Sequence, residues 1–159
     1  MAETSTEVSW LSQPEQQSWR AYLRGSRLLY EALDAALVEH GLRLTEYEIL
    51  SMLSEAPGGR LRMSVLAGLV VQSRSRLTHT ATRLERLGWV ERRNAVDDRR
   101  GVELTLTEAG LAALEEVAKV HAASVRGNFV DVLSPEQFAA LGEAMARVAA
   151  ALGEDHLPR

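Results

Sequence analysis

The sequence predicts a mainly α-helical fold with one small β-hairpin. Apolar residues recur at three- and four-residue intervals before residue 88 and after residue 107, which is the period of a buried helix face. Between these segments, residues 89–93 and 102–106 are rich in β-forming residues and enclose a polar turn, the pattern of a hairpin. With 159 residues and 46% hydrophobic content, the chain is expected to form a single domain, 1–159.

Two helices are expected before residue 57. The first covers 14–40, where Trp19 and Leu37 belong to one apolar face, and Gly41 ends it. A second helix is expected to begin at Thr45, because a hydroxyl followed by Glu48 three residues later is a capping-box pattern. The run Pro57-Gly58-Gly59 then breaks the chain.

The next two helices are predicted as a helix-turn-helix. A short helix over 63–70 is followed by a brief turn, and Ser73 can cap a helix that runs to Leu87 and stops at Gly88. The inward stripe of this second helix is predicted from its spacing to be Leu77, Ala81, Leu84 and Leu87.

The remaining elements are a hairpin and two long helices. Strands over 89–93 and 102–106 flank the turn 94–101, Thr107 opens a helix that reaches about Val132, and Ser134 with Pro135 begins a last helix to Leu152. A helix-turn-helix followed by such a hairpin is a winged helix-turn-helix. We therefore expect a winged lobe over 45–106, flanked by terminal helices over 14–40 and 107–152.

Charge is distributed unevenly along the chain, although its net value is only −4. Residues 60–101 hold ten arginines against four acidic residues, a balance of +6, whereas the rest holds eight basic and 18 acidic residues, a balance of −10. An acidic protein with one basic segment is expected if a single surface meets phosphates. A solvated charged face is the alternative for a generic run of charge.

The polar face of the helix over 73–87 carries side chains that reach base edges and phosphates from the major groove. The predicted DNA-binding residues of this recognition helix are Ser73, Arg74, Ser75, Arg76, Thr78, His79, Thr82, Arg83 and Arg86. In the wing, Arg99 and Arg100 are predicted to enter a narrow, electronegative minor groove. Asp98 is expected to structure the turn, because an acid there would repel phosphate. An ordinary polar helix face and a charged hairpin loop remain the alternatives.

Residues 98–110, DRRGVELTLTEAG, resemble the wing signature of the MarR family (multiple antibiotic resistance regulators), with Asp98, Arg100 and Gly110 at the family's spacing. The stretch 73–93, SRSRLTHTATRLERLGWVERR, looks like the recognition helix and first wing strand of that family. The resemblance implies a homodimer built from the first and last two helices, with two recognition helices in successive major grooves of a pseudo-palindromic operator.

Relatives of this kind often bind small aromatic or lipophilic ligands between the dimer base and the DNA-binding lobe. Residues of the types that line such a pocket are Trp19, Tyr22, Arg27, Tyr47 and Met52. The alternative is that these side chains belong to the core and the dimer interface.

Several other functions are not indicated by the sequence. There is no cysteine, and the four histidines lack metal-ligand spacing, so no metal is expected. No glycine-flanked serine, phosphate loop or other cofactor motif is present, and no enzymatic activity is predicted. The first ten residues lack the pattern of a secretory signal, which favours a cytoplasmic, nucleoid-associated protein with no membrane partner.

The sequence therefore predicts a sequence-specific regulator of transcription that binds double-stranded DNA, a homodimeric repressor released by a small-molecule ligand. One alternative is a DNA-binding regulator or architectural protein of the same fold without an effector. Another is a winged helix that serves as a protein-interaction module.

Overall fold

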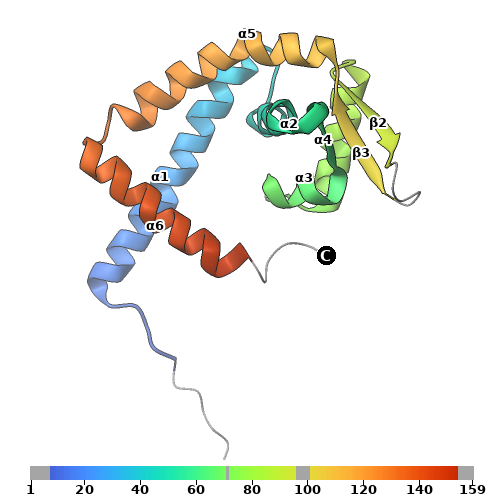
Figure 1. Cartoon of the computed structure of the whole chain (residues 1–159). Coiled ribbons are helices and arrows are strands. Elements are labelled where there is room, and N and C mark those ends of the chain that lie inside the picture. Colours follow the sequence, from blue (N-terminus) through green and yellow to red (C-terminus); the bar gives the residue numbers. More distant parts are fainter. Residues whose placement is uncertain (1–7, 71, 96–100, 154–159) are drawn as a thin grey trace, which may run out of the picture.

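The computed structural model describes residues 8–70, 72–95 and 101–153 (Figure 1). A winged lobe holds the middle of the chain, and long helices from both ends extend away from it on one side. In chain order the elements are α1 (Gln13–Val38), α2 (Leu44–Glu55), the 3-10 turn η1 (Pro57–Gly59), β1 (Arg60–Arg62), α3 (Met63–Leu69), α4 (Arg74–Arg86), β2 (Val90–Asn94), β3 (Val102–Leu106), α5 (Glu108–Val125), the π-helical segment η2 (Arg126–Val130) and α6 (Pro135–Gly153).

Helix α1 begins at a capping box and leads into the lobe at its carboxyl end. The Glu15 carboxylate accepts from the backbone N–H of Ser12 at 2.7 Å, which satisfies a donor at the start of the helix. Only Leu37, in the last turn, is buried. Most of the predicted apolar face of α1 therefore lies outside the core of this chain.

The predicted Thr45–Glu48 capping box of α2 is wrong. The N-cap is Arg43, two residues before the predicted one, and Glu46 accepts from the Arg43 N–H at 2.8 Å. The next N–H, that of Leu44, donates to Asp34 of α1 at 2.8 Å. Because α1 supplies an acceptor for this helix start, no local hydroxyl is needed there.

The helix-turn-helix is confirmed, with one change to its buried stripe. The Ser73 hydroxyl caps α4 by accepting from the Arg76 N–H at 3.4 Å, and Leu77, Ala81 and Leu84 are buried. Leu87 is instead 42% exposed. The helix ends before it, and Gly88, with φ of +74°, turns the chain away so that Val90 enters the core.

The sheet has a third strand that was not predicted. Strand β3 lies in the middle, antiparallel to both neighbours, with Leu61 of β1 opposite Leu104 and Val90 of β2 opposite Leu106. Strand β1 therefore joins the start of α3 directly to the base of the wing.

The two last helices agree with the prediction except for a local irregularity. The Thr107 hydroxyl caps α5 by accepting from the Gly110 N–H at 3.0 Å. The helix then continues through η2 to Val130 with π-type hydrogen bonding. Ser134 caps α6 by accepting from the Gln137 N–H at 3.2 Å.

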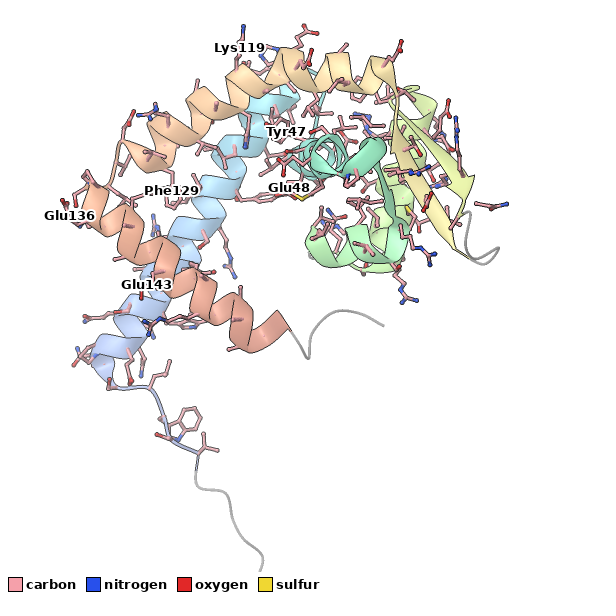
Figure 2. The ribbon with its side chains drawn as sticks, viewed as in Figure 1. Tyr47, Glu48, Lys119, Phe129, Glu136 and Glu143 are labelled. Carbon is pink, nitrogen blue, oxygen red and sulfur yellow. The ribbon has the colours of Figure 1, made fainter. Side chains whose placement is uncertain are left out.

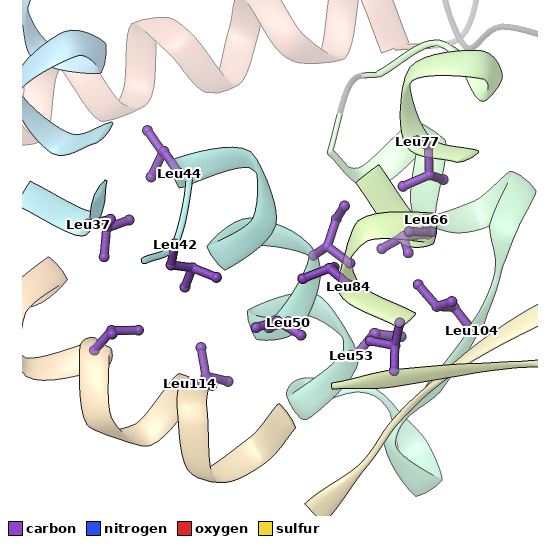
Figure 3. Close-up of a cluster of buried hydrophobic side chains, with 14 of the residues drawn as sticks. Leu37, Leu42, Leu44, Leu50, Leu53, Leu66, Leu77, Leu84, Leu104 and Leu114 are labelled. Carbon is purple, nitrogen blue, oxygen red and sulfur yellow. The ribbon is translucent and has the colours of Figure 1, made fainter. Parts of the chain in front are cut away.

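The core lies inside the lobe and is made mainly of leucine (Figure 3). Leu50 and Leu53 of α2 pack with Leu84 of α4 and Leu104 of β3, all of them fully buried. Leu114 brings α5 onto the same cluster. Among the described residues of α6, none is buried, so the last helix lies outside this core.

Gly110 is the point where α5 packs most closely on the wing. A Cβ at this position would collide with the carbonyl oxygen of Trp89 and lie 2.8 Å from Leu106 Cδ1. We expect Gly110→Ala to lower the free energy of unfolding by about 1–3 kcal/mol through overpacking, measured by chemical denaturation at fixed protein concentration. Gly127→Ala is the control, because a Cβ there meets no atom within 4 Å. Equal stability of the two variants would contradict this account.

Candidate nucleic-acid interface

Helix α4 presents a cationic and hydroxyl-bearing surface to solvent. The buried side of the helix is held by the core, so the opposite residues must face outward. The exposed predicted site residues are Ser73, Arg74, Ser75, Arg76, Thr78, His79, Arg83 and Arg86, whereas Thr82 is half-buried.

The threonine hydroxyls of α4 bond first to their own helix. Thr78 donates to the carbonyl of Arg74 at 2.8 Å and Thr82 to that of Thr78 at 2.9 Å. This uses the hydroxyl proton and leaves the oxygen as an acceptor. Thr78 is exposed and its oxygen can accept from a base or a bound water.

The Thr82 hydroxyl accepts a hydrogen bond from an arginine of the wing. The Arg92 guanidinium donates to the Thr82 hydroxyl at 2.9 Å and to the Thr78 carbonyl at 2.8 Å, and it pairs with Glu85 at 2.9 Å. One side chain of β2 therefore fastens the wing to the recognition helix. Sequence reasoning missed this role of Arg92, although the helical Glu85 seven residues earlier was a usable signal.

Arg83 is placed differently from the other predicted contacts. Its Nε donates to the carboxylate of Glu46 at 2.6 Å, and its Nη2 to the Gly41 carbonyl at 3.3 Å. The guanidinium is thus held against α2 and the loop before it. Its two hydrogen bonds link elements of the protein to each other.

A hollow of about 600 Å³ lies between the start of α3, the recognition helix and the strands of the wing. Arg62 of β1, Arg74 of α4 and Arg92 of β2 line it, together with the hydroxyl-bearing Ser64 and Thr78. Arg92 is already bonded to Thr78, Thr82 and Glu85, so Arg62 and Arg74 supply the guanidiniums that make this concave surface attractive to an anion of phosphate size. Sequence reasoning missed Arg62 because the strand that carries it was not foreseen.

The wing is described up to the base of its tip. The Ala95 N–H donates to the Gly101 carbonyl at 2.8 Å and closes the hairpin beyond the last strand pair. The predicted tip residues Asp98, Arg99 and Arg100 lie outside the described residues.

A second, apolar cavity of about 810 Å³ lies between α1, the start of α2 and the segment from η2 into α6. Of the five predicted pocket residues, only Tyr22 lines it. Trp19 stacks on Tyr22 with ring centroids 5.8 Å apart, and Arg27 is exposed on α1. Tyr47 and Met52 pack against the core, where Tyr47 lies 4.2 Å from the His121 ring.

Glu48 is the acidic side chain in this apolar cavity. Figure 2 shows it on the side of α2 that faces α1, with Phe129 further along the cavity wall. Burial raises the pKa of Glu48, because a charged carboxylate loses hydration there. Burial also raises the pKa of Tyr30, with smaller contributions from Asp34 and Glu48.

The described part of the chain holds neither a metal-binding cluster nor a membrane-spanning helix. Among residues 8–70, 72–95 and 101–153, no cluster of three or more histidine or acidic side chains could hold a metal ion. Within the same part of the chain, every helix is too short or too polar to span a bilayer.

The segment of the chain that carries this surface is similar to a known protein family. Residues 42–102, from the end of α1 to the start of β3, match the model of the MarR family. The matched segment contains the recognition helix and the arginine-lined hollow.

Two solved structures from Streptomyces coelicolor resemble most of the chain. AbsC, a MarR family transcriptional regulator, is 45% identical, with 91% of this chain and 98% of AbsC covered and a TM-score of 0.86. Sco3205, another MarR family transcriptional regulator and solved in complex with DNA, is 40% identical, with 96% and 98% covered and a TM-score of 0.91.

Two curated regulators match over a smaller share of this chain and of their own length. The regulator PecS of Dickeya dadantii is 33% identical over 114 residues, which is 70% of this chain and 66% of PecS. The repressor MprA of Escherichia coli is 35% identical over 89 residues, 56% of this chain and 51% of MprA. With an arginine-rich recognition helix, a three-stranded wing sheet and these two near full-length relatives, the chain belongs to the MarR family of transcriptional regulators.

Proposed function

We propose that this chain is a homodimeric repressor that binds double-stranded operator DNA through α4 and the wing. The observation that carries the proposal is the exposed cationic face of α4 beside a hollow lined by three arginines, on a chain whose remainder is acidic. The DNA complex of Sco3205 and the repressor MprA support it by similarity.

Within this proposal the contacts divide into two kinds. Arg76 and His79 lie on the exposed face of α4, where side chains in the major groove read base edges. Arg62 and Arg74 in the hollow, and Arg99 and Arg100 at the wing tip, would neutralise phosphates or enter the minor groove. The first kind sets sequence preference and the second sets affinity for any duplex.

Substitutions should separate these roles. Arg76→Ala and His79→Ala should each relax discrimination at particular base pairs by about 1–3 kcal/mol. Arg100→Ala should weaken binding to operator and random duplexes alike, and reduce the slope of log affinity against log salt by about 0.9. The measurement is fluorescence anisotropy titration at several salt concentrations.

The control is Arg147→Ala, which removes an arginine paired with Glu143 on α6, away from the lobe. It should leave both affinity and slope unchanged. Equal losses on operator and random DNA for all three test variants would contradict the division of roles. Wild-type affinity that does not vary with salt would contradict DNA as the partner.

The partner subunit is proposed to cover the exposed apolar faces of the terminal helices. Leu28 of α1 and Val148 and Leu152 of α6 are each between 47% and 54% exposed. Exposed apolar surface on neighbouring helices is typical of subunit contact. Twofold symmetry would place two α4 helices in major grooves about 10 bp apart.

Sedimentation equilibrium tests the dimer. The wild-type chain should sediment at twice its mass of 17.5 kDa. Val148→Glu should shift the equilibrium to the monomer, because twofold symmetry introduces two charges into an apolar contact. Val65→Glu, on α3 of the lobe and similarly exposed, is the control that stays dimeric. A wild-type monomer would contradict the proposal.

The cavity between α1, α2 and α6 is proposed as the site of a small aromatic or lipophilic ligand that releases the DNA. Tyr22, Leu29, Phe129 and Met145 give it an apolar wall, which suits such a molecule. In a relative of the same fold, BpsR of Bordetella bronchiseptica, DNA binding is regulated by 6-hydroxynicotinic acid.

A thermal-shift screen of aromatic acids and lipophilic compounds tests this part. A ligand at 100 times its dissociation constant should stabilise the protein by about 2.7 kcal/mol. Gly25→Phe should abolish that shift, because Gly25 lines the cavity and a Cβ there meets no atom within 4 Å. A shift that survives this substitution would place the ligand elsewhere. No shift with any compound would favour a regulator without an effector.

A further inference from the structure

Arg83 differs from the other basic residues of α4 because its guanidinium is bonded to other elements of the protein, at Glu46 and Gly41. It is 48% exposed at its side chain, yet its Nε is bonded to Glu46 at 2.6 Å. Arg86, three residues along the same helix, is exposed and has no ion pair among the described residues. The two arginines therefore offer a matched comparison on one helix.

Glu46 receives bonds from two separate elements. Its side chain is only 3% exposed. One carboxylate oxygen accepts from Arg83 of α4, and the other accepts from the backbone N–H of Arg43 at 2.8 Å. A buried carboxylate depends on such partners, because it has lost its hydration. The position of α4 is thus tied to the first turn of α2.

The same turn of α2 is tied to α1 by Asp34. One Asp34 oxygen accepts from the Leu44 N–H at 2.8 Å, and the other pairs with the Arg43 guanidinium at 2.8 Å. The Gly41 carbonyl in the connecting loop accepts from Arg83 as well, at 3.3 Å. Charge-assisted hydrogen bonds therefore run without a break from α1 through the start of α2 to α4.

We infer that Arg83 and Glu46 are positioning residues that fix the recognition helix relative to α1 and thereby set the spacing of the two operator half-sites. The inference rests on the proposed DNA-binding dimer. In that dimer the partner subunit holds α1, so the angle between α1 and α4 decides where the second recognition helix meets the duplex. Directional bonds to a buried carboxylate restrict that angle in addition to the restriction that apolar packing imposes.

The test compares Arg83→Gln and Glu46→Gln with the control Arg86→Gln. The probe is a duplex selected from a random library by the wild-type chain, together with versions whose centre is one base pair longer or shorter. The wild type should prefer the selected spacing. Both test variants should lose at least fivefold of that preference, the range of a coupling between distant parts of a protein, whereas Arg86→Gln should keep it.

Two further measurements distinguish a loss of positioning from the loss of a positive charge that contacts phosphate. The salt slope should be unchanged in Arg83→Gln, while loss of a phosphate contact would reduce it by about 0.9. The double variant Glu46→Gln/Arg83→Gln should lose no more spacing preference than either single variant, because the two groups act as one unit. If Arg83→Gln does not fold, Arg83→Lys replaces it, since a lysine keeps the charge but cannot span Glu46 and Gly41 together.

A reduced salt slope in Arg83→Gln, or an unchanged spacing preference in both test variants, would overturn the inference. Failure of the wild-type chain to select any duplex would instead overturn the proposed function. The two failures are therefore distinguishable within one set of titrations.

Discussion

Packing of α4 on the leucine core is the constraint on which the DNA-facing surface depends. Leu77 and Leu84 are fully buried in the hydrophobic cluster of the lobe, so the helix cannot rotate without exposing them to water. Every outward-facing arginine and hydroxyl of the recognition helix takes its direction from those two contacts. The polar surface is thus a consequence of apolar packing on the other side of the same helix.

Polar contacts then refine what the core has arranged. Arg92 fastens β2 to α4, Arg83 and Glu46 fasten α4 to α2, and Asp34 fastens α2 to α1. Each contact joins elements that are neighbours in space and uses a charged group, which makes it directional. The arginines of the basic segment therefore fall into two groups, those that hold the lobe together and those that remain exposed to a polyanion.

The sequence predicted well those elements whose ends are determined by hydrogen bonds between residues close together in the chain. Ser73 and Thr107 cap their helices as expected, because an N-cap hydroxyl bonds to an N–H only three residues away. The predicted start of α2 was wrong because Asp34, which accepts from the Leu44 N–H, lies ten residues earlier on another helix. Strand β1 was missed since it has three residues and exists only by pairing with β3. The inward bonds of Arg83 and the lining of the apolar cavity likewise depend on tertiary contacts that no local pattern encodes.

No residue of helix α6 is fully buried within its own subunit over its described length. Helices in proteins gain most of their stability from tertiary packing of an apolar face. In the proposed dimer, that packing would be supplied by a second molecule, so ordering of α6 and association would be one event. Dilution would then unravel the end of the chain as well as separate the subunits, and the amount of competent repressor would fall faster than the amount of protein.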